Sequence, residues 1–136
     1  MLSCLTRLPQ YWKVGVDIFG PSNLITTISA PAHWRKSDAE LIGDFTKEQD
    51  FLKERSPLTY IDKINADLLI IHGVNDPKVV KDESDQIVAR LRSIDRNVEY
   101  IILDDEGHGF TKFANMIKAN CHIDNHAHPR RANFQK

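Results

Sequence analysis

Short apolar runs alternate with polar stretches along the chain, and three of these runs have the composition of β-strands. They are KVGVDIF (13–19), DLLIIHG (67–73) and VEYIIL (98–103). DLLIIHG is almost entirely apolar, which is typical of a parallel strand covered on both faces of its sheet. The pattern therefore predicts a parallel sheet that contains these three strands.

Helical periodicity separates the second run from the third. In DESDQIVARLRS (82–93), Ile87, Val88 and Leu91 fall on one helical face, and charged residues fall on the other. A strand, a helix and a second strand over this distance predict a βαβ unit with a right-handed crossover. We therefore assign the chain to the α/β class.

The long segment between the first and second runs predicts further helices. Residues 46–57 open with Thr46 and have Gln49 three positions later, which is the spacing of a capping box. We also expect a helix over the second half of 29–45. The opening residues 1–9, MLSCLTRLP, have the pattern of the end of a helix.

Composition narrows the class of protein. The chain has 136 residues, of which 41% are apolar and 27% charged, and this indicates a globular domain with a real core. A net charge of −1 gives no electrostatic footprint for nucleic acid or an anionic membrane. No run approaches the length of a membrane span, and no secretory signal is visible. Because Cys4 and Cys121 are interpreted as free thiols, we expect a cytoplasmic protein.

The sequence changes character after Ala119. Residues 120–136, NCHIDNHAHPRRANFQK, are polar and lack helical periodicity, so we expect a domain over 1–119 followed by a poorly ordered tail. Four tail residues are of metal-ligand types: Cys121, His122, His126 and His128. Pro129 and the polarity of the segment argue against a helix that would align them, so we expect no native metal site.

Two loops that follow predicted strands carry ionisable residues. Asp76 lies in HGVNDPKV (72–79), and His108 lies in DDEGHGF (104–110). The carboxyl ends of adjacent parallel strands meet at one edge of the sheet, where open α/β sheets bind ligands. A carboxylate bonded to imidazole Nδ1 would leave Nε2 as a base. On spacing alone, an ordinary turn role for Asp76 and an ordinary loop role for His108 stay open.

Longer stretches around these loops resemble a known family. SPLTYIDKINADLLIIHGVNDPKVVKDESDQIVARLRS (56–93), followed by VEYIILDDEGHGF (98–110), resembles the C-terminal part of the catalytic domain of prolyl oligopeptidase family serine peptidases. The resemblance is to dipeptidyl-peptidase and acylaminoacyl-peptidase-like members, and KVGVDIFGPSNLI (13–25) is similar to their strand and loop after the nucleophile helix. It implies a partial α/β-hydrolase fold of about three parallel strands with flanking helices. It also implies that Asp76 is the triad acid and His108 the triad base.

The family's nucleophile lies in a Gly-x-Ser-x-Gly-Gly elbow, and none of the chain's serines has that context. The resemblance implies hydrolysis of peptide substrates through an acyl-enzyme, without a cofactor, once the missing serine is supplied. We therefore expect a fragment that is inactive alone. The alternatives are a non-catalytic remnant that self-associates through an exposed sheet edge, and another α/β-hydrolase such as an esterase.

The resemblance also suggests where a substrate side chain would bind. In the family, the excursion after the first strand contributes to the pocket for the residue before the scissile bond. Leu24, Ile28 and Trp34 are the candidates in this chain. Ordinary packing of a helix on the sheet explains these three residues equally well.

Overall fold

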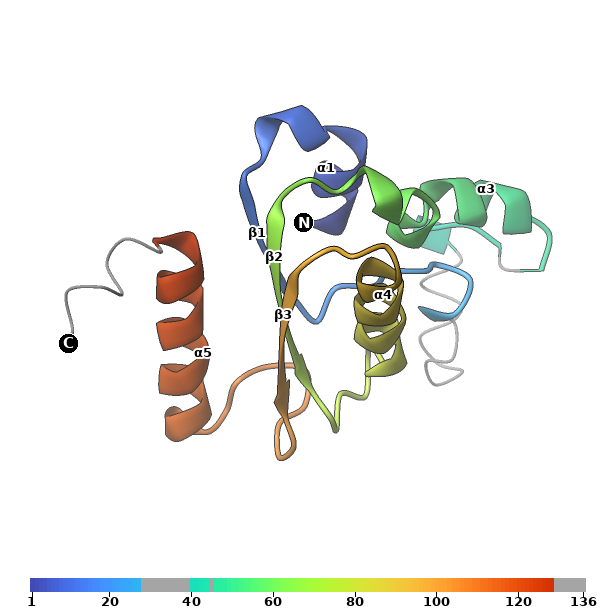
Figure 1. Ribbon diagram of the computed structural model, residues 1–136. Coiled ribbons are helices and arrows are strands. Elements are labelled where there is room, and N and C mark those ends of the chain that lie inside the picture. The colour runs from blue at the N-terminus through green and yellow to red at the C-terminus, as the bar shows by residue number, and fades with distance from the viewer. Residues whose placement is uncertain (28–39, 45, 129–136) are drawn as a thin grey trace.

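The computed structural model describes residues 1–27, 40–44 and 46–128. In chain order, the elements are α1 (Leu2–Arg7), the 3₁₀ helix η1 (Pro9–Tyr11), β1 (Val14–Ile18), α3 (Gln49–Arg55), the 3₁₀ helix η3 (Pro57–Lys63), β2 (Asp67–Gly73), α4 (Asp82–Ser93), β3 (Val98–Leu103) and α5 (Phe113–Ala127). Figure 1 shows the strands as a layer with α5 on one face and α1 and α4 on the other.

The strands form one parallel sheet in the order β1-β2-β3. Leu68 in β2 pairs with Gly15 in β1 and with Val98 in β3, so β2 is the middle strand of this sheet. The second and third strands have the bounds that the apolar runs predict. The parallel βαβ unit is therefore confirmed in β2, α4 and β3.

Alternation along β2 divides the core into two layers. Leu68 and Ile70 pack in a cluster with residues of α1 and α4, whereas Leu69 and Ile71 pack with residues of α5. All four side chains are at most 1% exposed, and each contributes about 1.5–3 kcal/mol relative to an exposed position. The middle strand is thus the most buried element, as its apolar composition predicts.

Helix α4 packs the predicted apolar stripe against the sheet. Ile87, Val88 and Leu91 are all buried in the cluster that includes β2 and β3 residues. Its first turn is also buried, because Glu83 and Ser84 are 0% and 2% exposed. A buried carboxylate and hydroxyl need hydrogen-bond partners, and these lie in the loop after β1 for Glu83 and at the end of β2 for Ser84.

The predicted capping box is wrong. Helix α3 begins at Gln49, with Glu48 as the preceding residue and no side-chain cap. The hydroxyl of Thr46 instead donates to Asp44, whose Oδ1 also accepts the backbone N–H groups of Thr46 and Lys47. Asp44 therefore forms a turn before the helix, which leaves Thr46 outside it. The helix expected within 29–45 lies largely outside the described residues.

Helix α5 continues through residues 120–127, so the expectation of a poorly ordered tail is wrong there. Ala119 is fully buried and Ile123 packs beside it on the sheet, four positions further along the same helical face. Ala119 and Ile123 thus form a short apolar stripe, and most of the other residues from 120 to 127 are polar. Residues 129–136 lie outside the described residues. Within the described parts of the chain, no helix is long and apolar enough to cross a membrane.

Candidate active site

The loop that follows β2 holds the Asp76 carboxylate in a fixed orientation. Oδ1 accepts the backbone N–H groups of Lys78 and Val79 at 2.8 and 2.9 Å. The side chain is fully buried, so these bonds replace its lost hydration. Oδ2 of the same carboxylate faces the loop that follows β3.

His108 lies in that second loop and bonds Asp76. Its Nδ1 is 2.8 Å from Asp76 Oδ2, and a third of its side chain is exposed. Because an ionised carboxylate only accepts, Nδ1 carries the proton in this bond and Nε2 of the neutral ring is the basic nitrogen. The flanking Gly107 and Gly109 bridge each other around His108, and Gly109 has φ +144°, a conformation that favours glycine.

Backbone bonds join the two loops directly. The N–H of Val74 donates to the Leu103 carbonyl at 3.0 Å, and the N–H of Asn75 donates to the Glu106 carbonyl at 2.9 Å. A Cβ at Gly73 would lie 2.5 Å from the carbonyl oxygen of Gly107, so the close approach of the loops requires glycine there. The spacing between Asp76 and His108 is therefore set by main-chain contacts.

Glu106 supports the loop that carries His108. Its carboxylate accepts the backbone N–H groups of Thr111 and Lys112, the Thr111 hydroxyl and the Asn115 amide, and the residue is 1% exposed. These bonds, chiefly the one from the Thr111 N–H, lower the pKa of Glu106 to about 2. Its place in an acidic loop of the sequence gives no sign of this structural role.

Two further rings, those of Phe19 and His72, lie beside the Asp76–His108 pair, and no pattern in the sequence singles them out. Phe19 follows β1 with φ 55°, and its ring centroid lies 5.3 Å from that of His108 and 5.6 Å from that of His72. His72 is fully buried at the end of β2, and its Nε2 is 3.7 Å from Asp76 Oδ2. The positive φ of Phe19 is uncommon for a residue other than glycine, and it can be seen only in the structure.

The buried Glu83 of α4 holds the loop that follows β1. Its carboxylate accepts the N–H and hydroxyl of Ser22, both at 2.9 Å, and the N–H of Asn23 at 2.8 Å. This loop carries Leu24, which is half-buried. Ile28 and Trp34, the other predicted substrate-binding residues, lie outside the described residues, so the predicted pocket is untested.

Asp17 is a second buried acid near the end of β1. It is 4% exposed, and burial raises its pKa to about 6. A Cβ at Gly20 would lie 2.3 Å from its Oδ1, so the carboxylate packs directly on this glycine. Asp17 and Gly20 also line a cavity of about 140 Å³ beside Met1 and Leu2.

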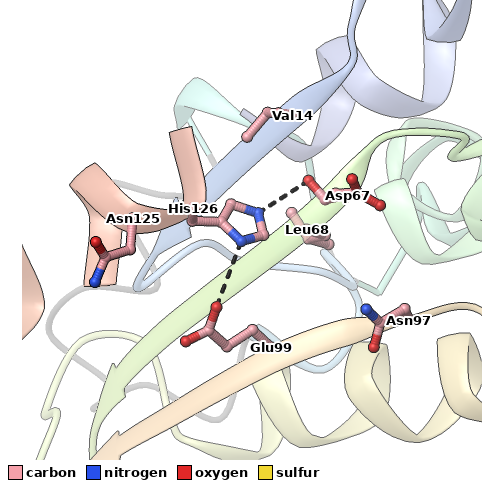
Figure 2. A pocket seen from close by; sticks show the side chains of 7 residues that line it. All are labelled: Val14, Asp67, Leu68, Asn97, Glu99, Asn125 and His126. Carbon is pink, nitrogen blue, oxygen red and sulfur yellow. Dashed lines mark hydrogen bonds and ion pairs between the residues drawn. The ribbon is translucent and has the colours of Figure 1, made fainter. Parts of the chain in front are cut away.

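A separate histidine–carboxylate cluster lies where α5 meets the amino end of β3. Nδ1 of His122 is 2.7 Å from Glu99, and Nδ1 of His126 is 3.4 Å from the same carboxylate. Figure 2 shows His126 between Asp67 and Glu99. These three residues line a cavity of about 280 Å³. The helix aligns His122 and His126, which the sequence analysis did not expect. No group of three or more His, Cys, Asp or Glu side chains among the described residues could hold a metal ion.

Comparison with known proteins shows the family of the chain. A model described as the prolyl oligopeptidase family matches residues 1–126. The chain belongs to the prolyl oligopeptidase family. The match includes residues 120–126, which the composition had assigned to a separate tail.

Two curated proteins are similar to the chain. Dipeptidyl peptidase family member 6 of Caenorhabditis elegans is 42% identical over 130 residues, covering 90% of this chain. Dipeptidyl aminopeptidase BIII of Pseudoxanthomonas mexicana is 43% identical over 126 residues, covering 88% of this chain. The chain spans 18% of the length of each of these relatives.

A solved structure shares the fold. The puromycin-hydrolyzing peptidase of Mycobacterium tuberculosis matches with a TM-score of 0.80 and 27% identity, over 87% of this chain and 18% of that one. The predicted partial α/β-hydrolase fold, with parallel strands and flanking helices, is thus confirmed. Membership of the prolyl oligopeptidase family does not assign roles to single residues, so the catalytic roles of Asp76 and His108 stay predictions.

Proposed function

We propose that this chain supplies the acid and the base of a Ser–His–Asp triad in a serine peptidase of the prolyl oligopeptidase family. The observation that carries the proposal is the 2.8 Å bond between His108 Nδ1 and the buried, doubly backbone-bonded carboxylate of Asp76. A buried carboxylate on Nδ1 selects the tautomer in which Nε2 is the base, and a part-exposed ring leaves that nitrogen open to a reactant.

The proposed mechanism is acyl transfer followed by hydrolysis. His108 Nε2 takes the proton of the serine hydroxyl as the serine oxygen attacks the scissile carbonyl, and the Asp76 carboxylate stabilises the imidazolium that forms. His108 then gives this proton to the leaving amine. In the second half, the same nitrogen activates the water that releases the acid product. The chemistry uses only side chains, backbone N–H groups and water.

The nucleophile in this proposal comes from a Gly-x-Ser-x-Gly-Gly elbow, which the 136 residues do not contain. The substrate is proposed to be a peptide. Two relatives are named as a dipeptidyl peptidase and a dipeptidyl aminopeptidase, so a peptide cleaved after its second residue is the first substrate to test. Leu24, on the loop that Glu83 holds, is the described residue proposed to border the substrate pocket.

A chimera tests the proposed roles. Residues 1–126 of this chain replace the matched residues of dipeptidyl aminopeptidase BIII, and hydrolysis of a dipeptidyl nitroanilide is measured. We expect His108→Ala to lower kcat by about 10⁴-fold or more. His122→Ala is the matched control, because it removes a histidine bonded to an exposed carboxylate, and it should retain the activity of the chimera.

The chain alone provides a second test. Without the elbow serine, the purified 136-residue chain should form no covalent adduct with a serine-directed phosphonate. The adduct is measured by intact mass. Stoichiometric labelling, or a His108→Ala chimera with activity within about tenfold of its parent, would contradict the proposal.

A further inference from the structure

The buried imidazole of His72 makes two hydrogen bonds that connect α4 to the loop carrying Asp76. Its Nδ1 is 2.7 Å from the hydroxyl of Ser84, and its Nε2 is 2.9 Å from the carbonyl oxygen of Val79. The ring is 0% exposed and Ser84 is 2% exposed, so water does not compete for either bond.

These partners determine where the proton lies. A carbonyl oxygen only accepts, so Nε2 of His72 carries the proton and donates to Val79. In the neutral ring, Nδ1 is then an acceptor, and the Ser84 hydroxyl donates to it. The Val79 carbonyl therefore selects the tautomer of His72, and the Ser84 hydroxyl, which can donate or accept, completes the bonding of the ring.

Val79 carries this constraint to Asp76. Its N–H donates to Asp76 Oδ1 at 2.9 Å, while its carbonyl accepts from His72. His72 Nε2 is 3.7 Å from Asp76 Oδ2, beyond hydrogen-bond distance, so His72 acts on the carboxylate chiefly through the turn. Loss of the His72 bond would free the turn that supplies the N–H groups of Lys78 and Val79.

We propose that His72, held in place by its bonds to Ser84 and Val79, is a positioning residue for Asp76. The inference rests on the proposed function, in which Asp76 orients His108. It adds His72 and Ser84 to the residues that support the site, as buried side chains behind Asp76. Without them, Asp76 Oδ2 would lose its alignment with His108 Nδ1, while the fold of the sheet would be retained.

The test uses the full 136-residue chain and the NMR signal of the His108 Nδ1 proton, which is shifted to low field when bonded to a carboxylate. The measured quantity is the rate at which this proton exchanges with water. Asp76→Asn is the reference for loss of the pair, and it should abolish the signal. Circular dichroism of each variant shows whether it is folded.

Two substitutions at His72 distinguish loss of the hydrogen bond to Val79 from loss of the imidazole ring. His72→Gln places an amide nitrogen near the position of Nε2, so it can still donate to Val79. His72→Asn places its amide near Nδ1, so it can bond Ser84 but cannot reach Val79. We expect exchange of the His108 proton to become about tenfold faster in His72→Asn, and to stay within about threefold of the wild-type rate in His72→Gln.

Ser84→Ala keeps the proposal testable if a His72 variant fails to fold. It removes the hydroxyl that bonds His72 Nδ1 and helps to hold the ring against Val79, and we expect exchange about threefold faster. Equal rates in folded His72→Asn and His72→Gln, or a wild-type rate in Ser84→Ala, would overturn the inference while the wild-type signal and its loss in Asp76→Asn still support the proposed function. A missing wild-type signal, or one that persists in Asp76→Asn, would instead contradict the proposed function.

Discussion

Two histidine–carboxylate pairs lie at opposite ends of the sheet. His108 bonds Asp76 at 2.8 Å beyond the carboxyl ends of β2 and β3, and His122 bonds Glu99 at 2.7 Å near the amino end of β3. By distance and by atom type, the two pairs are nearly the same. Their surroundings differ, because the Asp76 side chain is 0% exposed whereas that of Glu99 is 41% exposed.

The two carboxylates differ in their burial and backbone contacts and hardly at all in their distance to histidine. Asp76 accepts two backbone N–H groups in addition to His108, and its loop is bonded to the neighbouring loop. Glu99 is shared between His122 and His126 at the surface, where water competes for each bond.

The largest contrast is expected in catalysis. In the chimera with dipeptidyl aminopeptidase BIII, Asp76→Asn should lower kcat by about 10⁴-fold, because an amide at this position no longer selects the Nδ1–H tautomer of His108. Glu99→Gln makes the same chemical change in the surface pair and should alter kcat by less than about twofold. Both values come from initial rates at saturating substrate. Comparable losses in the two variants would remove the proposed distinction between the pairs.

The next contrast concerns the approach of the two loops. Gly73→Ala places a Cβ 2.5 Å from the Gly107 carbonyl oxygen and should lower the free energy of unfolding by about 3 kcal/mol. Gly107→Ala is a matched control, since its Cβ would lie 3.4 Å from the nearest heavy atom, an ordinary contact, and we expect a cost below about 1 kcal/mol. Urea denaturation measures both, and equal costs would show that the loops do not need this close approach.

A pH experiment sharpens the comparison within the His108 loop. The pKa of Glu106 is lowered to about 2, below its ordinary value of 4.5, because Thr111, Lys112 and Asn115 bond its ionised form. This contribution to stability is fully present above pH 4.5 and is lost as pH falls toward about 2. As pH is lowered from 4.5 to about 2, the urea concentration at the unfolding midpoint should therefore fall less steeply for Glu106→Gln than for the wild type. Glu99→Gln should keep the wild-type slope; a wild-type slope in Glu106→Gln would contradict the assignment.

The smallest effect is expected at the surface pair itself. His122→Ala should change the free energy of unfolding by less than about 0.5 kcal/mol, because both partners are about two-fifths exposed. The residual difference should shrink further in about 1 M NaCl, where exposed charges are screened. A loss above about 1.5 kcal/mol by thermal or urea denaturation would show that α5 depends on this pair far more than its exposure indicates.

Local patterns in the sequence were sufficient for the elements whose apolar residues lie close together in the chain. The bounds of β2, β3 and α4 agree with the apolar runs and with the stripe of Ile87, Val88 and Leu91. Asp76 and His108 could be brought together from topology, since adjacent parallel strands end at one edge.

Residues with distant partners were not found by this reasoning. Glu83 has the pattern of a solvated helix residue, but its partner Ser22 lies 61 positions away. The role of His72 depends on Ser84 and Val79, which only the folded loop brings together. Residues 120–127 were assigned to a tail because a stripe of only Ala119 and Ile123 is too short to stand out from polar neighbours.

The first turn of α4 joins two loops that are far apart in the chain. Glu83 bonds the loop after β1, and the adjacent Ser84 bonds His72, which holds the loop after β2. Opening of this single turn would release both loops together, because each loses a buried hydrogen-bond partner at the same moment. We therefore expect the loop after β1 and the loop that carries Asp76 to open as one cooperative unit, with its least replaceable contacts in two consecutive residues.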